Sequence, residues 1–131
     1  MEYTTEFDEA EEICIVRVKG QHKRPEDSLI LQQLARDIED EQGYQRFLFD
    51  MRQAEIRASN FDTFTTGTVP IDPDRRQTRQ RIALVYVCLL AVHKFMETVA
   101  VNRGYQLKVF DQMDEALAWL GSNRSSESHR Q

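Results

Sequence analysis

The stretch VFDQMDEALAWLGS, from Val109 to Ser122, predicts the end of a strand followed by a short amphipathic helix. Asp111 fits the N-cap of this helix, and the two acids of its first turn suit the positive end of the helix dipole. Trp119 and Leu120 offer a large apolar area, and full burial of such side chains stabilises a fold by about 2 to 3 kcal/mol each. Gly121 is expected to end the helix. The stretch therefore predicts a closing helix that seals the edge of an apolar core.

Upstream of this stretch, apolar runs predict β-strands. An N-terminal hairpin is expected, with its second strand from Ile13 to Lys19 and with Gly20 as its end. Three further strands are expected in the runs RFLFD (46–50), RIALVYV (81–87) and QLKVF (106–110). The first of these runs ends in Asp50, at a point where a buried parallel strand would open onto a loop.

Helical patterns separate these strands. The first runs from about Pro25 to Glu41 and stops at Gly43, with an apolar stripe made by Leu31, Leu34, Ala35 and Ile38. A short helix is expected to start at Ser59 or Asn60 and to carry Phe61 and Phe64 inward. A third helix follows RIALVYV, with one face formed by Leu89, Val92, Phe95, Met96 and Val99.

This alternation predicts an α/β fold with a mixed, mostly parallel sheet of about five strands flanked by about four helices. Residues 1–121 are expected to form a single domain, and residues 122–131 a disordered C-terminal tail that has nothing to bury.

Composition narrows the functional classes. The chain has 131 residues, 40% of them hydrophobic and 30% charged, and a net charge of −5, which disfavours nucleic acid as a partner. Cys14 and Cys88 lie in apolar runs and form neither a disulfide framework nor a metal cluster, so a cytoplasmic location is expected. The acidic N-terminus does not resemble a secretory signal. The longest apolar run, from Ile82 to Val92, is too short to span a membrane.

Several of these segments together resemble a known family. RIALVYV, HKFMETVAVNRGY, KVFDQMDEALAWL and the earlier VKGQHKRPEDSLILQQL are similar to the SpoIIAA-like branch of the anti-sigma-factor-antagonist (STAS) fold, over about Ile13 to Leu120. The resemblance implies a small cytoplasmic bacterial protein with a mixed sheet flanked by helices. Relatives of this fold serve mainly as protein-binding modules, and the branch is also compared with the CRAL-TRIO lipid-carrier domains.

The resemblance also bears on Ser59. In phosphorylatable members of the STAS fold, a strand ending in Asp is followed by an Asp-Ser-Ser-Gly motif whose first serine is the switch. Aligning the strand-end acid with Asp50 puts Ser59 at that serine, but Ala58, Asn60 and Phe61 replace the other three residues of the motif. We therefore interpret Ser59 as a helix cap, with phosphorylation as the alternative.

No catalytic residue, cofactor or metal is predicted. His93 and Glu97 have the spacing of two metal ligands on a helix, but no third ligand accompanies them, so a surface or boundary pair is the simpler interpretation. Ser59, His93 and Asp50 could be drawn as a triad, but the chain has no nucleophile elbow and no glycine-rich oxyanion loop. The glycines are scattered singly, so no phosphate-binding loop is expected.

The remaining candidate site is a basic group at Arg75, Arg76 and Arg79. It is interpreted as part of a solvated linker, with docking to an acidic partner or an anionic lipid headgroup as the alternative. The leading hypothesis is a non-enzymatic module that binds another protein, or itself as a homodimer, through the segment from Asp50 to Phe64. The alternative is a carrier or sensor of a lipid or other small apolar ligand, held beneath Phe61 and Phe64.

Overall fold

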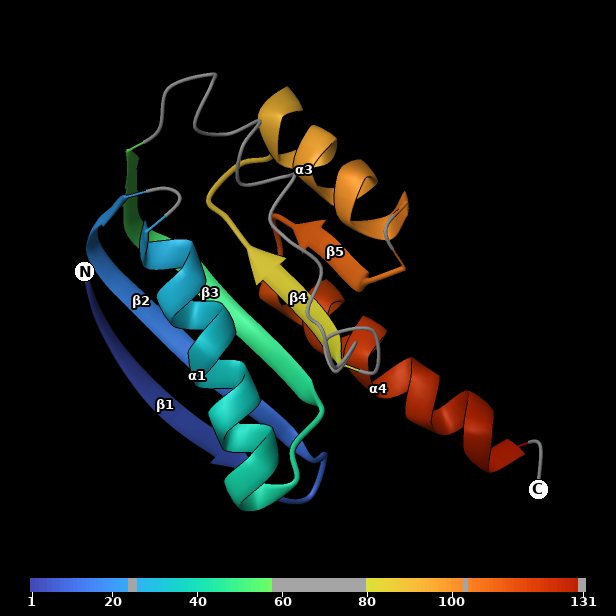
Figure 1. Cartoon of the computed structure of the whole chain (residues 1–131). Helices are drawn as coiled ribbons and strands as arrows, with labels where there is room; N and C mark the ends of the chain where they lie inside the picture. Colours follow the sequence, from blue (N-terminus) through green and yellow to red (C-terminus); the bar gives the residue numbers. More distant parts are fainter. Residues whose placement is uncertain (24–25, 58–79, 103, 130–131) are drawn as a thin grey trace.

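The computed structural model describes residues 1–23, 26–57, 80–102 and 104–129, and of residues 56–57 and 122–129 it describes the backbone only. The elements along the chain (Figure 1) are β1 (Glu2–Asp8), β2 (Ile13–Lys23), α1 (Glu26–Gln42), β3 (Arg46–Arg57), β4 (Arg81–Val85), α3 (Ala91–Asn102), β5 (Gln106–Phe110) and α4 (Met113–His129). The expected α/β class and the five strands are confirmed. The described residues form three helices rather than about four, and the helix expected from Ser59 falls in 58–79, outside them.

The five strands form one sheet in which their order in space equals their order in the chain, β1-β2-β3-β4-β5. β1 pairs antiparallel with β2, and the closing pair of this hairpin is Asp8 with Ile13. The pairs β2–β3, β3–β4 and β4–β5 are all parallel. A parallel connection must return to the starting end of the sheet, which explains the helices between β2 and β3 and between β4 and β5. The expected mixed, mostly parallel sheet is confirmed.

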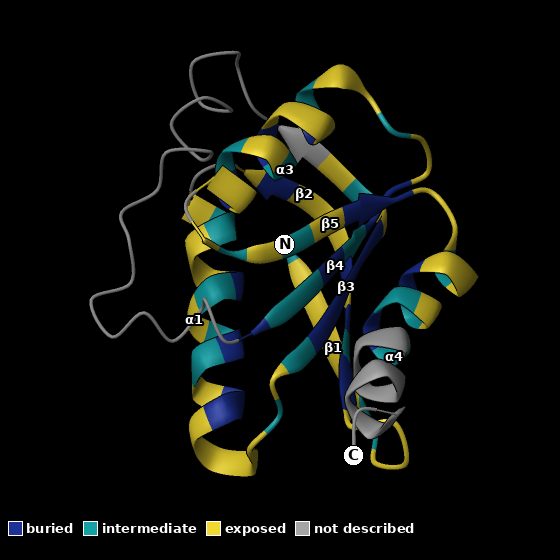
Figure 2. Cartoon of the chain, turned by 90° about the vertical axis from the view of Figure 1, so that its right-hand side faces the viewer, coloured by how far each residue is buried: buried dark blue, intermediate teal, exposed yellow. Residues whose placement is uncertain are grey.

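Helices cover both faces of this sheet. Figure 2 shows α1 and α3 on one face and α4 on the other. Because side chains alternate along a strand, each strand supplies both layers of the core. The layer under α1 and α3 includes Cys14, Val16, Phe47, Phe49 and Val109. The layer under α4 includes Ile13, Leu48, Ala83, Val85 and Phe110. Within the described residues, no helix combines the length and the apolar composition that crossing a membrane requires.

The helix α1 closely follows its prediction. Leu31, Ala35 and Ile38 are buried against the sheet, as the three-and-four spacing indicates. Gly43 ends the helix with a φ of +79°, and its N–H donates to the carbonyl of Glu39 at 2.9 Å. A residue with a side chain is strained at this φ, so glycine is the residue that suits the end of this helix.

Gly20 does not end β2, which continues to Lys23. The pairing with β3 shifts register between Arg17 and Lys19, and Gly20 has a φ of +79°. A local irregularity of this kind bends a strand without ending it, and glycine permits the unusual backbone angle at little cost. The strand therefore turns at Gly20. Because β3 extends beside it to Arg57, the expectation that this strand ends at Asp50 and opens onto a loop there is wrong.

The buried face predicted for α3 is partly wrong. This helix begins at Ala91 and buries His93, Met96 and Ala100, whereas Phe95 is 44% exposed. Successive helical residues are about 100° apart, so Phe95 lies well away from the stripe centred on Met96. The histidine therefore replaces the phenylalanine in the packed face.

The helix α4 differs from its prediction at its far end. It was expected to stop at Gly121, but it continues to His129. A glycine within a helix costs roughly 0.5 to 1 kcal/mol relative to alanine, which a packed helix can tolerate. The end of the folded domain at residue 121 and the disorder of residues 122–131 stay predictions.

The closing helix packs on the sheet as expected, but its tryptophan lies at the rim of the core. Leu120 is fully buried, whereas Trp119 is only partly buried. The indole packs against the ring of Phe110 at 5.8 Å, and the guanidinium of Arg81 lies 3.9 Å above the indole. Nε and Nη2 of Arg81 also donate to the carbonyl oxygen of Trp119, at 3.3 and 3.1 Å. Arg81, the first residue of β4, thus connects this strand to α4.

Candidate functional site

Asp50 is the one predicted site residue that lies within the described part of the chain. The others lie outside the described residues, so their roles stay predictions: Ser59, Asn60, Phe61, Phe64, Arg75, Arg76 and Arg79. Asp50 occupies the last position at which β3 pairs with β4, opposite Val85. Alternation along β3 gives Asp50 the same face as Leu48, which packs under α4.

The carboxylate of Asp50 is buried, with 7% of the residue exposed, and it is held by Arg52. Nε of Arg52 donates to Oδ1 and Nη2 donates to Oδ2, both at 2.9 Å. The backbone N–H of Arg52 also donates to Oδ1, at 3.2 Å. A two-pronged guanidinium contact of this type is the strongest form of a charge-assisted hydrogen bond in proteins.

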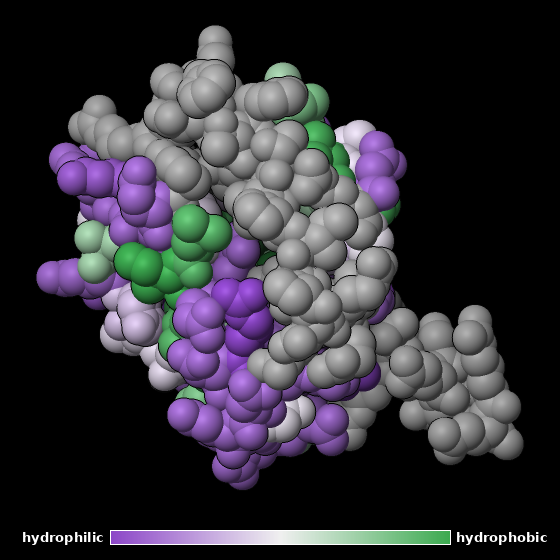
Figure 3. Space-filling view, viewed as in Figure 1, coloured by the Kyte–Doolittle hydropathy of each residue, from purple (hydrophilic) through white to green (hydrophobic). Residues whose placement is uncertain are grey.

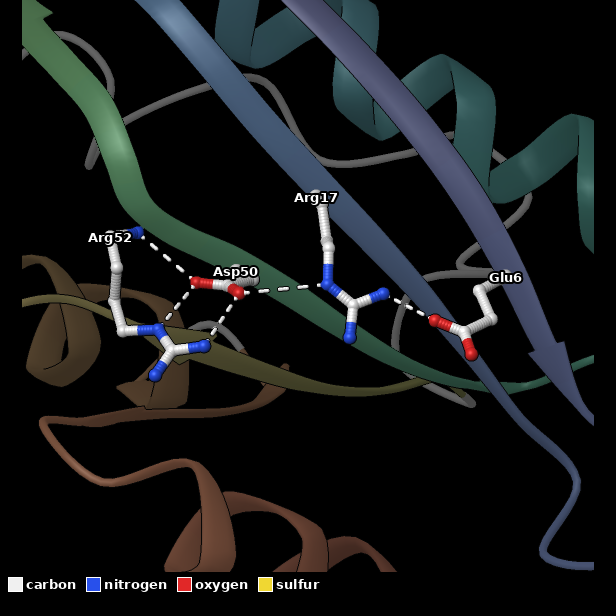
Figure 4. Close-up of polar contacts among 4 residues, drawn as sticks. All are labelled: Glu6, Arg17, Asp50 and Arg52. Atoms are coloured by element: carbon white, nitrogen blue, oxygen red, sulfur yellow. Dashed lines mark hydrogen bonds and ion pairs between the residues drawn. The ribbon is translucent and has the colours of Figure 1, made fainter.

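The contact extends across two more strands (Figure 4). Nε of Arg17, on β2, lies 4.0 Å from Oδ2 of Asp50, and Nη1 of Arg17 contacts Oε2 of Glu6 on β1. The charges therefore alternate from Glu6 through Arg17 and Asp50 to Arg52, a set that we call the charge ladder. The arginine and glutamate side chains are about half exposed, and Asp50 is the buried member.

The charge ladder determines the chemistry open to Asp50. The hydrogen bonds from the Arg52 side chain lower the pKa of Asp50 below its ordinary value; burial opposes this, and the Arg52 backbone N–H and the charges of Arg52 and Arg17 add to it. Asp50 is therefore ionised at neutral pH and is a weak proton acceptor. A general base needs a pKa near the working pH, so this carboxylate is poorly suited to acid–base catalysis.

The second constellation considered from the sequence, His93 with Glu97, has structural roles. The His93 ring stacks on Tyr86 at 3.8 Å, and its Nδ1 accepts the N–H of Leu90 at 3.1 Å. Oε1 of Glu97 accepts the N–H of Val109 at 2.8 Å, which ties α3 to β5. Among the described residues, no three His, Cys, Asp or Glu side chains lie close enough together to hold a metal ion.

The triad drawn from Ser59, His93 and Asp50 is not assembled in this fold. His93 packs on the face of the sheet that α3 covers, and Asp50 lies on the opposite face. A sheet therefore separates the imidazole from the carboxylate, and the two cannot share a proton.

Sequence reasoning missed both arginines of the charge ladder. Arg52 could have been found, because it follows Asp50 by two residues and the period of a strand places both side chains on one face. The contact with Arg17 could not, because it requires the register between β2 and β3, in which Arg17 pairs with Asp50. Exposed Val87 was also missed, because it was assigned to the strand that in fact ends at Val85.

Comparison with known proteins identifies the fold. No family model matches the chain, and no curated protein matches it. Among solved structures, it is similar to an uncharacterised protein of the DUF3478 family with a SpoIIAA-like fold from Shewanella loihica PV-4, with a TM-score of 0.55 and 15% sequence identity. That match covers 91% of this chain and 92% of the other.

A second similar structure is the anti-sigma factor antagonist SpoIIAA in its unphosphorylated form, with a TM-score of 0.52 and 9% identity, covering 98% of each chain. The chain therefore has a SpoIIAA-like fold, as its resemblance to that family implied. At these identities the likeness concerns the fold, and the function has to be argued from the residues of this chain.

Proposed function

We propose that this chain is a non-enzymatic, STAS-like protein-interaction module, with a regulatory role. It binds another protein, or a second copy of itself as a homodimer, at the edge where its parallel strands end. The segment from Asp50 to Phe64, in which a loop and a helix were expected, continues as β3 up to Arg57, and its remaining residues lie outside the described part of the chain. The fold supports this proposal, since one of the similar structures is an anti-sigma factor antagonist, a protein named for its action on other proteins.

The observation that carries the proposal is the exposure of large apolar side chains at that edge. Val87 and Leu90, which follow β4, are 73% and 54% exposed. Leu29 and Ile30, near the start of α1, are 44% and 48% exposed. Figure 3 shows hydrophobic surface near the start of α1 and the start of α3. Exposed apolar surface rimmed by polar residues is typical of protein-binding sites, and ligands of open α/β sheets bind at the carboxyl ends of the strands.

The charge ladder supports a binding role over a catalytic one. Asp50 is the acid that sequence reasoning marked as a candidate for chemistry, and its ion pair with Arg52 keeps it in the unreactive charged form. This two-pronged contact restrains the side chains of Asp50 and Arg52 beside the end of β4. That rigidity suits a surface that recognises a partner by shape.

The proposal can be tested with a double variant, Val87→Glu with Leu90→Glu, and a matched control, Val101→Glu. Val101 is a similarly exposed aliphatic residue, 51% exposed, at the opposite end of α3. Light scattering measures the homodimer, and cross-linking in the native host followed by mass spectrometry identifies other partners. We expect the double variant to lose the contact and Val101→Glu to keep it, with circular dichroism showing that both are folded.

A monomeric wild-type protein that captures no partner in its host, or a double variant that binds as well as the wild type, would contradict the proposal. The lipid-carrier alternative depends on Phe61 and Phe64, which lie outside the described residues. It predicts that protein purified from cells retains an apolar ligand detectable by native mass spectrometry. Retention of such a ligand, together with the absence of a partner, would favour the carrier.

A further inference from the structure

The strand β1 forms one edge of the sheet and is paired on one side only. In the described residues no strand lies beyond it, and all seven of its residues pair with β2. In an antiparallel ladder, alternate residues direct their N–H and C=O groups away from the partner strand. The outer side of β1 therefore presents a row of backbone donors and acceptors, which is the template for adding another strand.

Little of the described part of the chain covers this edge. Residues 2–6 are all exposed, and only the end of β1 packs, through the Phe7 ring, against Tyr44 at 5.1 Å. Figure 1 shows α4 lying behind β4 and β5, on the half of the sheet away from β1. The other edge strand, β5, has five residues and buries Val109 and Phe110, so its edge is shorter and better covered.

The charge at this edge is strongly negative. Glu2, Glu6 and Asp8 alternate along β1 and share one face. The first twelve residues hold six of the 22 acids and none of the 17 lysines and arginines, so the rest of the chain is close to neutral. Oε2 of Glu6 contacts Arg17, and Oδ1 of Asp8 accepts the N–H of Glu11. A carboxylate can accept several hydrogen bonds, so both acids keep capacity for another cation.

These charges disfavour pairing of β1 with a second copy of itself. In an antiparallel pair related by a two-fold axis, centring on Thr4 places Glu2 opposite Glu6. Centring on Thr5 places Glu2 opposite Asp8, and centring on Glu6 places that residue opposite itself. Like charges directly opposite each other destabilise a strand pair, and opposite charges there stabilise it. The same edge that rejects its own copy therefore favours a basic strand.

We infer that the outer edge of β1 binds an extended, basic segment of another protein as an added antiparallel strand. The segment carries lysine or arginine opposite Glu2, Glu6 and Asp8, and uncharged β-forming residues opposite Tyr3 and Phe7. Backbone hydrogen bonds to β1 hold the segment, and the alternating cations set its register. This surface lies on the β1 side of the sheet and does not depend on the carboxyl edge proposed above.

The probe for this inference is the peptide KVRTTVK, which places its cations and valines in that register. Fluorescence polarisation measures its binding to the full chain, beside a scrambled peptide, TKKRVVT, of the same composition. Since opposite charges directly across a strand pair stabilise it, and the scrambled peptide lacks them at Glu2 and Asp8, we expect roughly tenfold weaker binding of the scrambled peptide. The double variant Glu2→Lys with Asp8→Lys should weaken the binding of KVRTTVK by at least the same factor. The control is Glu115→Lys, which replaces an exposed acid on α4 and should leave the binding of KVRTTVK unchanged.

Two further measurements separate an added strand from simple charge attraction. Peptides N-methylated at alternate positions block one backbone edge each, so one form should bind and the other should fail. Hydrogen exchange followed by NMR should show slower exchange of alternate β1 amides when the peptide is bound. The inference would be overturned if KVRTTVK did not bind or if the scrambled peptide bound equally well. It would also be overturned if the exchange of the β1 amides were unchanged or if the chain formed a dimer through β1. Val87→Glu with Leu90→Glu should leave this binding unchanged, so either proposal can fail without the other.

Discussion

Replacing Asp50 by asparagine will lower the free energy of unfolding by about 1 to 2 kcal/mol at neutral pH. A hydrogen bond to a charged group contributes about 1.5 to 3 kcal/mol, and Asp50 accepts two from the Arg52 side chain and one from its backbone. Arg52 is about half exposed, so water can replace part of the hydrogen bonding that its guanidinium loses with Asp50. The expected loss of stability therefore lies near the low end of the range for a charged hydrogen bond. Asparagine keeps one carbonyl oxygen that can still accept the backbone N–H.

The effect should depend on pH in a definite direction. Folding lowers the pKa of Asp50, so its carboxylate stabilises the fold above the ordinary carboxyl pKa of about 4, and this contribution is lost as the pH falls through the lower pKa of the folded state. Asparagine does not titrate. The stability difference between wild type and Asp50→Asn should therefore be constant around neutral pH and should shrink in acid.

Urea unfolding followed by circular dichroism and by the fluorescence of Trp119, the single tryptophan, measures this difference. Glu41→Gln is the matched control, because Glu41 is an exposed acid, and its removal should change stability by less than about 0.5 kcal/mol. A double-mutant cycle with Arg52→Gln should give a coupling of about 1 kcal/mol. A change no larger than that of the control, or an equal change in acid and at neutral pH, would refute the role given to this ion pair.

Three further outcomes are expected. Leu120→Ala, at a fully buried site, should cost about 2 to 5 kcal/mol in urea unfolding, and a cost below about 1 kcal/mol would show that α4 does not seal the core. Burial raises the pKa of the Cys14 thiol to about 11, so a thiol reagent at mildly alkaline pH should label exposed Cys88 quickly and Cys14 only after unfolding; two equally fast labels would contradict this. Gly43→Ala should cost about 1 kcal/mol, because its φ is +79° although nothing crowds the added methyl group; an unchanged midpoint would show that the helix end relaxes.

The layered architecture could be predicted because each element carries its own local signal. The stripe of Leu31, Ala35 and Ile38 and the terminating Gly43 define α1 without help from the rest of the fold. The strand 81–85 is an almost uninterrupted apolar run, as a strand covered on both faces requires.

The errors arose where tertiary contacts override local pattern. Phe95 has the apolar character of a core residue, yet His93 takes the buried position because its ring stacks on Tyr86 and its Nδ1 accepts a backbone N–H. Gln80, in a segment interpreted as a polar linker, is fully buried and donates to the carbonyl of Ala35 and to Glu39. These acceptors, more than 40 residues away in the chain, bind the NH2 group of Gln80, and no pattern near Gln80 records them.

The candidate site was predictable only at Asp50. The sequence places Asp50 after a buried apolar run, but β3 continues past it to Arg57, and the lowering of its pKa depends first on the rotamer of Arg52 and also on Arg17 from a neighbouring strand. The open edge of β1 was not predicted, because strand order is a property of the whole sheet. A sequence pattern can indicate that a strand exists, but it does not say which neighbour the strand lacks.

The agreement between strand order and chain order bears on how the protein is made. As the chain leaves the ribosome, each new strand meets an edge built by the one just before it, and none has to insert between two that are already joined. If the strands join in chain order, the open side of the growing sheet moves from β2 to β5. No described strand uses the far side of β1, so a basic strand has access to it whatever the order in which the other strands join.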